Sequence, residues 1–213
     1  MRRGGSSRTA ATEGEERRRC PPATLAPYTL PMGDERRKLH GGALPGYPEE
    51  IGRWLWAMEE VRTHTLGLTL GMNHRTLEWS GPRGDENSVS TLLYHIAIVE
   101  MDWLFSDLHE GELPEALRPE LPFPMRTGEK LTPVTGLSLG DHHARLDRTR
   151  RVFLKDMEGM TLSEWRRPRH PPNVDYEVTP QWAVFHLVEH EAGHAFQISA
   201  LMARAARFFS GQE

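Results

Sequence analysis

The chain has 213 residues, a length that favours one domain with an additional segment. A formal net charge of −4 gives no overall electrostatic case for a nucleic-acid partner, and the single cysteine excludes both a disulfide framework and a zinc site built from paired thiolates. No apolar run approaches the roughly 18 residues that a membrane span needs. We therefore expect a cytoplasmic protein with no nucleic-acid and no membrane partner, and its unusual feature is a count of 11 histidines.

The first 48 residues differ in composition from the rest of the chain. Nine Lys/Arg against five Asp/Glu give them a charge of +4, whereas the remaining 165 residues carry −8. They show almost no aliphatic periodicity, so they cannot bury enough surface to offset their ordering entropy. We predict a disordered tail over 1–46 and one domain over 47–210; an upstream start codon chosen in error also fits. A solvated extension is favoured over a contact with nucleic acid or membrane, and no apolar stretch of a secretory signal follows the arginines.

The domain begins with two predicted helices. Apolar residues recur at a spacing of three and four from Tyr47 onward, with Pro48 as a suitable first helical residue. A loop rich in glycine, proline and aspartate, residues 80–87, is expected to end this helix. Ser88 is a good N-cap for the second helix, whose apolar stripe comprises Leu92, Ile96, Val99 and Trp103.

Two further helices follow a long connection over 111–135. The third is expected over about 138–159, and the fourth begins at Thr179-Pro180 and continues without a breaker through Phe209. Four helices, two long connections and no convincing strand predict an all-α protein, a four-helix bundle.

Three histidines of the last helix, His186, His190 and His194, are spaced four residues apart. Residues four apart share a helical face, so neighbouring imidazoles can share one ion, whereas His186 and His194 lie about 12 Å apart and cannot. His95 falls within the apolar stripe of the second helix and is expected to point inward. One histidine from that helix and a pair from the last make a three-histidine site with an open position, as catalytic metal sites have.

Alternatives to a metal site stay open at this point. A lone histidine such as His95 on an apolar face is more often a hydrogen-bonded core residue, and a pair such as His190 and His194 can arise by chance. A bundle whose histidines only satisfy one another also fits. The other histidines are expected in loops or on exposed faces: His40, His64, His74, His109, His142, His143 and His170.

The string from His190 to His194 also matches the HExxH pattern of zinc metalloproteases, with Glu191 as the would-be general base. The context is poor. Gln197 stands where a metzincin needs glycine, no histidine follows, and Glu213 is the only later carboxylate. No predicted strand could hold an extended peptide, so a protease is not favoured.

Two segments carry a family resemblance. Residues 87–97 with Glu100 and Trp103, and residues 179–198, are similar to the second and fourth helices of the DinB-like superfamily of metal-dependent enzymes. The resemblance covers roughly 47–209. In that family the second helix holds one ligating histidine and the fourth holds two, four residues apart. In this register the implied ligands are His95, His190 and His194.

The resemblance implies an up-down-down-up bundle, often dimeric, that binds zinc or nickel. Characterised relatives include transferases and isomerases that use low-molecular-weight thiols such as bacillithiol or mycothiol. We therefore expect a homodimer acting on a small-molecule substrate by thiol S-transferase chemistry at a divalent metal. A metal-dependent hydrolase and a non-catalytic metal-binding stress protein are the alternatives.

Residues around the implied ligands carry further expectations. His186, Glu100 and Gln197 are candidates to orient a ligand through its far nitrogen. A fourth ligand, with His186, Glu100 or Asp102 as candidates, would make the site structural. The sequence departs from the family at residues 195–196, where Ala-Phe replaces the usual Arg-Gly, and we expect a narrower or more apolar wall beside the metal.

Overall fold

The computed structural model describes residues 39–212, so most of the predicted tail, 1–46, lies outside the described residues. The segment before the first helix lies against the start of that helix. The backbone N–H of Leu44 donates to the carbonyl of Gly52 at 3.0 Å. A Cβ at Gly52 would lie 2.9 Å from the Leu44 oxygen, so this close approach requires glycine.

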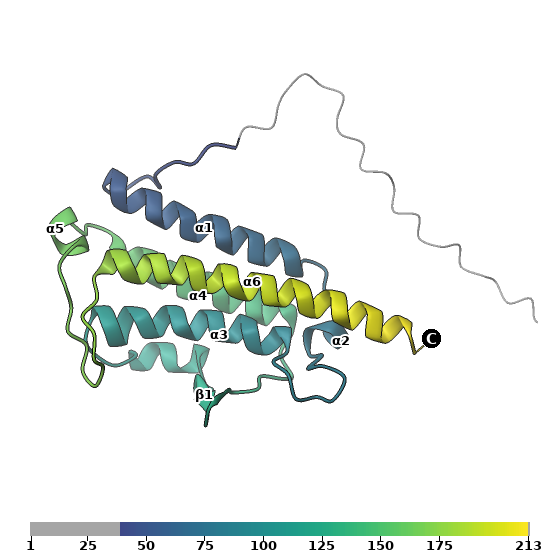
Figure 1. The fold of residues 1–213 in the computed structure, drawn as a ribbon. Helices are drawn as coiled ribbons and strands as arrows, with labels where there is room; N and C mark the ends of the chain where they lie inside the picture. Colours follow the sequence, from purple (N-terminus) through teal and green to yellow (C-terminus); the bar gives the residue numbers. More distant parts are fainter. Residues whose placement is uncertain (1–38, 213) are drawn as a thin grey trace, which may run out of the picture. The chain divides into compact units, whose positions relative to one another are not determined.

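Four long helices dominate the described chain (Figure 1): α1 (Glu49–Thr69), α3 (Val89–Asp102), α4 (Leu139–Met157) and α6 (Pro180–Ser210). The shorter elements are α2 (His74–Leu77), the π-helix η1 (Trp103–Leu108), the 3₁₀-helix η2 (Glu115–Glu120), the strands β1 (Arg126–Thr127) and β2 (Lys130–Leu131), and α5 (Leu162–Trp165). The two strands pair with each other as an antiparallel hairpin. The expected all-α class is confirmed.

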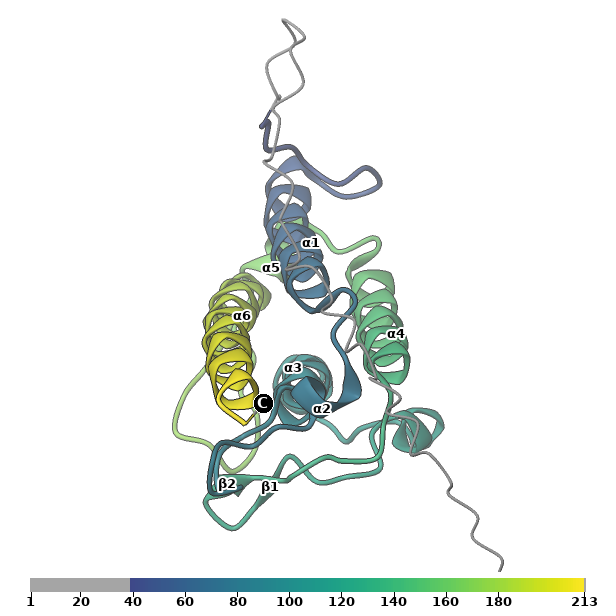
Figure 2. The same ribbon diagram turned by 90° about the vertical axis from the view of Figure 1, so that its right-hand side faces the viewer.

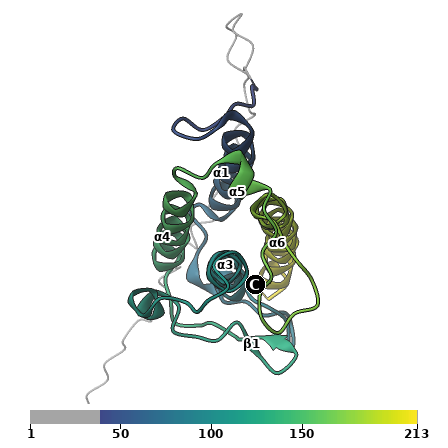
Figure 3. The same cartoon turned by 90° about the vertical axis from the view of Figure 1, so that its left-hand side faces the viewer.

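Seen end-on, the four long helices lie at four corners, with α4 opposite α6 and α1 opposite α3 (Figures 2 and 3). The Tyr47 hydroxyl, just before α1, donates to the carbonyl of Leu154 near the end of α4 at 2.9 Å. The hydroxyl of Thr69, at the end of α1, lies 2.8 Å from Nε2 of His143, near the start of α4. Helices α1 and α4 are therefore antiparallel, while α6 runs in the direction of α1 (Figure 1).

Side-chain caps explain where the helices begin. Ser88 and Thr179 accept backbone N–H bonds at the starts of α3 and α6, and Ser138 forms a capping box at the start of α4. These three starts are the predicted ones. Helix α1, however, ends at Thr69 and does not continue to the loop at 80–87, because Gly71 adopts a φ of 74° that a helix cannot accommodate.

Each long helix contributes a fully buried aliphatic side chain to one core: Leu55, Leu93, Leu146 and Ile198 are all 0% exposed. Burying such a side chain contributes roughly 1.5–3 kcal/mol, so this shared core holds the four helices together.

Four charged side chains, one from each long helix, are buried within that core. We call Arg62, Glu100, Arg150 and Glu191 the buried charge cluster; none is more than 4% exposed. Arg62 bonds Glu100 and Glu191 at 2.7 Å each, and Arg150 bonds Glu100 at 2.8 Å and Glu191 at 3.1 Å. Burial alone would raise the pKa of Glu100, but the two guanidinium groups outweigh it and hold that pKa below its usual value.

The cluster uses its hydrogen-bonding capacity almost fully. Arg62 also donates to the carbonyl of Leu146, and Arg150 donates to the carbonyl of Met58 at 2.8 Å. Two guanidinium groups against two carboxylates leave the cluster itself with no net charge. The cluster therefore connects all four long helices.

Among the described residues, no helix combines the length and the apolar character that crossing a membrane requires.

Candidate metal centre

The structure brings His95, His190 and His194 together between α3 and α6. His190 and His194 lie one turn apart on α6, and His95 faces them from α3 with only 7% of its surface exposed. Nε2 of His190 lies 3.2 Å from Nε2 of His95 and 3.0 Å from Nε2 of His194. One ring nitrogen from each of the three histidines lies within 4.8 Å of the other two, so the three residues could hold one metal ion.

These separations fit a shared ion. Metal–nitrogen bonds of about 2.1 Å place neighbouring donor nitrogens about 3.0–3.4 Å apart. Nδ1 of His194 donates to Oε1 of Gln197 at 3.0 Å, which turns the unprotonated Nε2 towards the other two rings. Three converging imidazole nitrogens cannot all satisfy one another by hydrogen bonds, because a neutral ring carries only one N–H. The histidine cluster could therefore bind a divalent metal.

Burial keeps these imidazoles neutral. Loss of hydration, with the charges of His194 and Arg126 adding to it, lowers the pKa of His95 to about 4. Loss of hydration and the neighbouring histidines lower the pKa of His190 to about 3, and burial also lowers the pKa of His194. At neutral pH all three rings therefore keep a lone pair for a metal.

The three histidines open onto a cavity of about 580 Å³, which we call the histidine cavity. Its other walls come from the loop over 85–87, the β1–β2 hairpin and Gln197. This volume falls within the roughly 300–1,000 Å³ of small-molecule sites. Arg126 and Lys130 of the hairpin lie in the wall, a contribution that the sequence analysis missed because nothing in a long proline-interrupted connection places it beside α6.

The three residues predicted to orient ligands have different surroundings. Gln197 bonds His194, as described above. Glu100 belongs to the buried charge cluster, and its oxygens accept from Arg62 and Arg150. The ring of His186 stacks on Trp182 with centroids 5.3 Å apart and an interplanar angle of 5°.

The candidates for a fourth ligand are also accounted for. Glu100 is held by the two arginines, and Asp102 is exposed and accepts from the Ser106 hydroxyl at 2.9 Å. His186 lies between aromatic rings, 4.8 Å from Trp103 by ring centroids. Within the described residues no fourth histidine, cysteine or carboxylate joins the three donor atoms.

Two features singled out in the sequence, Glu191 and the departure from the family at 195–196, do not line the histidine cavity. Glu191, the would-be protease base, is 2% exposed and bonds Arg62 and Arg150. Phe196 does not line the histidine cavity: it is 77% exposed and, together with the buried Ala195, borders a groove between α1 and α6. The expectation of a narrower or more apolar wall beside the metal is therefore wrong, because neither residue lines the histidine cavity.

One histidine outside the centre corrects an expectation. His142, assigned above to a loop or an exposed face, is 1% exposed, and its Nε2 lies 2.8 Å from the Ser90 hydroxyl. It lies on the α4 face that packs against α3, because the register of α4 is set by its capping box at Ser138.

The fold and the converging histidines define an all-α protein with a candidate metal centre between two of its helices. A family model described as the DinB superfamily matches residues 57–198, so the chain belongs to the DinB superfamily. Among curated proteins no match is found.

Proposed function

We propose that His95, His190 and His194 hold one divalent ion, zinc or nickel, and that the protein transfers a low-molecular-weight thiol to a small electrophile. The observation that carries this proposal is the convergence of three Nε2 atoms, 3.0 and 3.2 Å apart in the two closest pairs, at the edge of a cavity of about 580 Å³. Membership of the DinB superfamily supports it.

The chemistry follows from the charge of the donors. A divalent ion on three neutral imidazoles keeps its full positive charge and supplies a Lewis acid that lowers the pKa of a thiol or of water. The chain's own contribution is to keep the rings neutral by burial and to hold the tautomer of His194 through Gln197. Imidazole donors suit both zinc and nickel.

The wall of the histidine cavity favours an anionic small molecule. Asp85 and Glu86 are paired with Arg83 and Arg204, so their charges are compensated. The other charges of the wall are those of Arg126, Lys130 and Glu129, so two cations stand against one carboxylate. Arg126 donates to the backbone carbonyl of Glu129 and, within the described residues, forms no ion pair with a carboxylate. A thiolate or a substrate carboxylate would meet this positive charge beside the histidines.

A metal-binding protein without turnover is the competing class. Such a protein needs no room beside its ion, whereas here a cavity of substrate size adjoins the three nitrogens. The size of the cavity is the reason for preferring an enzyme.

The test combines metal analysis with an assay. Purified protein should contain one divalent ion per chain by elemental analysis, and metal-loaded protein should conjugate bacillithiol or mycothiol to a chromogenic electrophile. Chelation should abolish conjugation, and added zinc or nickel should restore it. Metal binding with ester hydrolysis and no conjugation would replace the transferase with a hydrolase, and metal binding with neither activity would leave a binder.

A further inference from the structure

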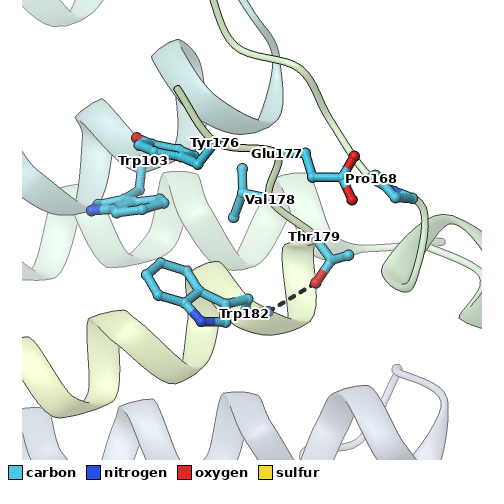
Figure 4. A pocket seen from close by; sticks show the side chains of 7 residues that line it. All are labelled: Trp103, Pro168, Tyr176, Glu177, Val178, Thr179 and Trp182. Atoms are coloured by element: carbon cyan, nitrogen blue, oxygen red, sulfur yellow. Dashed lines mark hydrogen bonds between the residues drawn. The ribbon is translucent and has the colours of Figure 1, made fainter. Parts of the chain in front are cut away.

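A second cavity, of about 460 Å³, lies where the loop before α6 meets the first residues of α6 and η1 (Figure 4). We call it the aromatic pocket. Its lining contains no histidine of the candidate metal centre and comprises Trp103, Pro168, Tyr176, Glu177, Val178, Thr179 and Trp182.

Three aromatic rings form one side of the aromatic pocket. The rings of Trp103 and Tyr176 are nearly parallel, at 23°, with centroids 6.2 Å apart, and the Trp182 ring lies 5.3 Å from Trp103. Tyr176 is 44% and Trp182 48% exposed, although each could bury a large apolar area. Exposed rings gathered around a concave surface are typical of small-molecule sites.

The walls of the aromatic pocket are held in place by hydrogen bonds. The Tyr176 hydroxyl donates to the buried carboxylate of Asp107 at 2.6 Å. Arg169 and Val178 exchange backbone hydrogen bonds of 2.7 and 3.1 Å across the loop. Trp182 donates its backbone N–H to the Thr179 hydroxyl, the bond drawn in Figure 4. A pocket formed before binding loses little freedom when a ligand enters.

The charge of the lining selects the ligand. Among the described residues, Glu177 is the only charged side chain that lines the pocket, and no lysine or arginine does so. Among the described residues, the partner of the Glu177 carboxylate is His170, whose Nδ1 lies 3.9 Å away on an exposed side chain. The faces of aromatic rings are electronegative and attract cations, and a nearby carboxylate adds to that attraction.

We infer that the aromatic pocket binds a small organic ammonium ion whose body is apolar or aromatic. The rings contact the apolar body, and Glu177 faces the ammonium group. This site is separate from the proposed metal site, because the ring of His186 lies between Trp182 and His190. The centroid of the His186 ring is 5.3 Å from that of Trp182 and 5.8 Å from that of His190. Binding in the aromatic pocket therefore requires no metal.

The experiment is a ligand-detected NMR titration of the full-length, metal-free protein with benzylamine, benzyl alcohol and benzoate. These probes share one ring and differ in charge at neutral pH. We expect saturable binding of benzylamine, weaker binding of benzyl alcohol and no saturable binding of benzoate. Equal binding of all three, or binding of none, would overturn the inference.

Two variants and a control locate the binding. Trp182→Ala should weaken benzylamine at least tenfold, whereas Phe185→Ala, which removes an equally exposed ring of α6 outside the lining, should leave it unchanged. Glu177→Gln should reduce benzylamine affinity to that of benzyl alcohol without changing the latter. Because the Glu177 side chain is 65% exposed, this variant keeps the fold and decides the question even where Trp182→Ala lowers stability. An unchanged preference for the amine in Glu177→Gln would contradict the assigned ligand.

Discussion

The hydrogen bond between Gln197 and His194 decides which nitrogen of His194 faces the other two histidines. Without it, the His194 ring is free to rotate or to change its tautomer. We expect Gln197→Ala to weaken zinc affinity about 10–100-fold, as the loss of such orienting partners does. Competition with a chromophoric chelator measures this, and Gln181→Ala, a glutamine of the same helix outside the histidine cavity, should leave the affinity unchanged.

The three histidines of α6 should differ in importance. His190 lies at hydrogen-bond distance from both other donors, so His190→Ala leaves two separated imidazoles and should abolish stoichiometric metal binding. His186 contacts aromatic rings instead, and His186→Ala should retain one ion per chain. If elemental analysis finds that His186→Ala loses the ion as His190→Ala does, the assignment of ligands is wrong by one turn.

His142 gives the fold a pH dependence away from the metal centre. Burial, with the charge of Arg145 adding to it, lowers the pKa of His142 to about 4, below the roughly 6.5 of an unfolded histidine. Between these values the unfolded chain binds the proton and the folded chain does not. Stability is therefore full above about pH 6.5 and falls as the pH drops towards 4, by up to about 3 kcal/mol from this residue.

Urea denaturation of the metal-free protein between pH 7 and pH 4.5 measures this loss. His142→Gln removes the titrating group, so the slope of stability against pH should become shallower whatever the variant's stability at pH 7. An unchanged slope would show that other groups cause the pH dependence.

Among the interactions between helices, we expect the buried charge cluster to be the most sensitive to substitution. Arg150→Met leaves Glu100 and Glu191 without one of their two partners and should lower the free energy of unfolding by about 3–5 kcal/mol. Adding Glu100→Leu restores electrical balance around the remaining pair of Arg62 and Glu191, so the double variant should recover much of that loss. Equal instability of the single and double variants in urea would contradict this account.

Helix positions follow from the sequence more readily than buried charges do. Apolar spacing and caps such as Ser88 and Ser138 report local preferences, which the structure keeps. Arg62 and Arg150 look in sequence like ordinary charges of a solvated helix face. Their burial depends on partners that lie 38 to 129 residues away along the chain, and no local pattern encodes such pairs.

At the scale of the whole molecule, the histidine trio could be predicted and its surroundings could not. Spacing and helix faces place His95, His190 and His194 together, because both helices present one side to a common core. The hairpin that walls the histidine cavity and the loop that forms the aromatic pocket belong to long connections. The course of these connections depends on contacts between distant parts of the chain, which the spacing of apolar residues does not predict.

Association with a second copy is the prediction at this scale. The family resemblance implies a homodimer, and Phe196, at 77% exposure, borders an apolar groove of about 450 Å³ between α1 and α6. We expect Phe196→Ser to shift the protein towards monomers in light scattering after gel filtration. Leu70→Ser, an equally exposed residue outside that groove, serves as the control. A wild-type protein that is monomeric at micromolar concentration would contradict the prediction.

The division of the histidine trio between α3 and α6 also has a consequence for biosynthesis. His95 precedes His190 by 95 residues along the chain, so it is translated well before its two companions on α6. A nascent chain therefore carries only one of the three converging histidines until α6 has been translated. The three donors can come together only once α6 packs on α3, so we expect a chain truncated before His190, which lacks two of the three donors, to bind no stoichiometric ion.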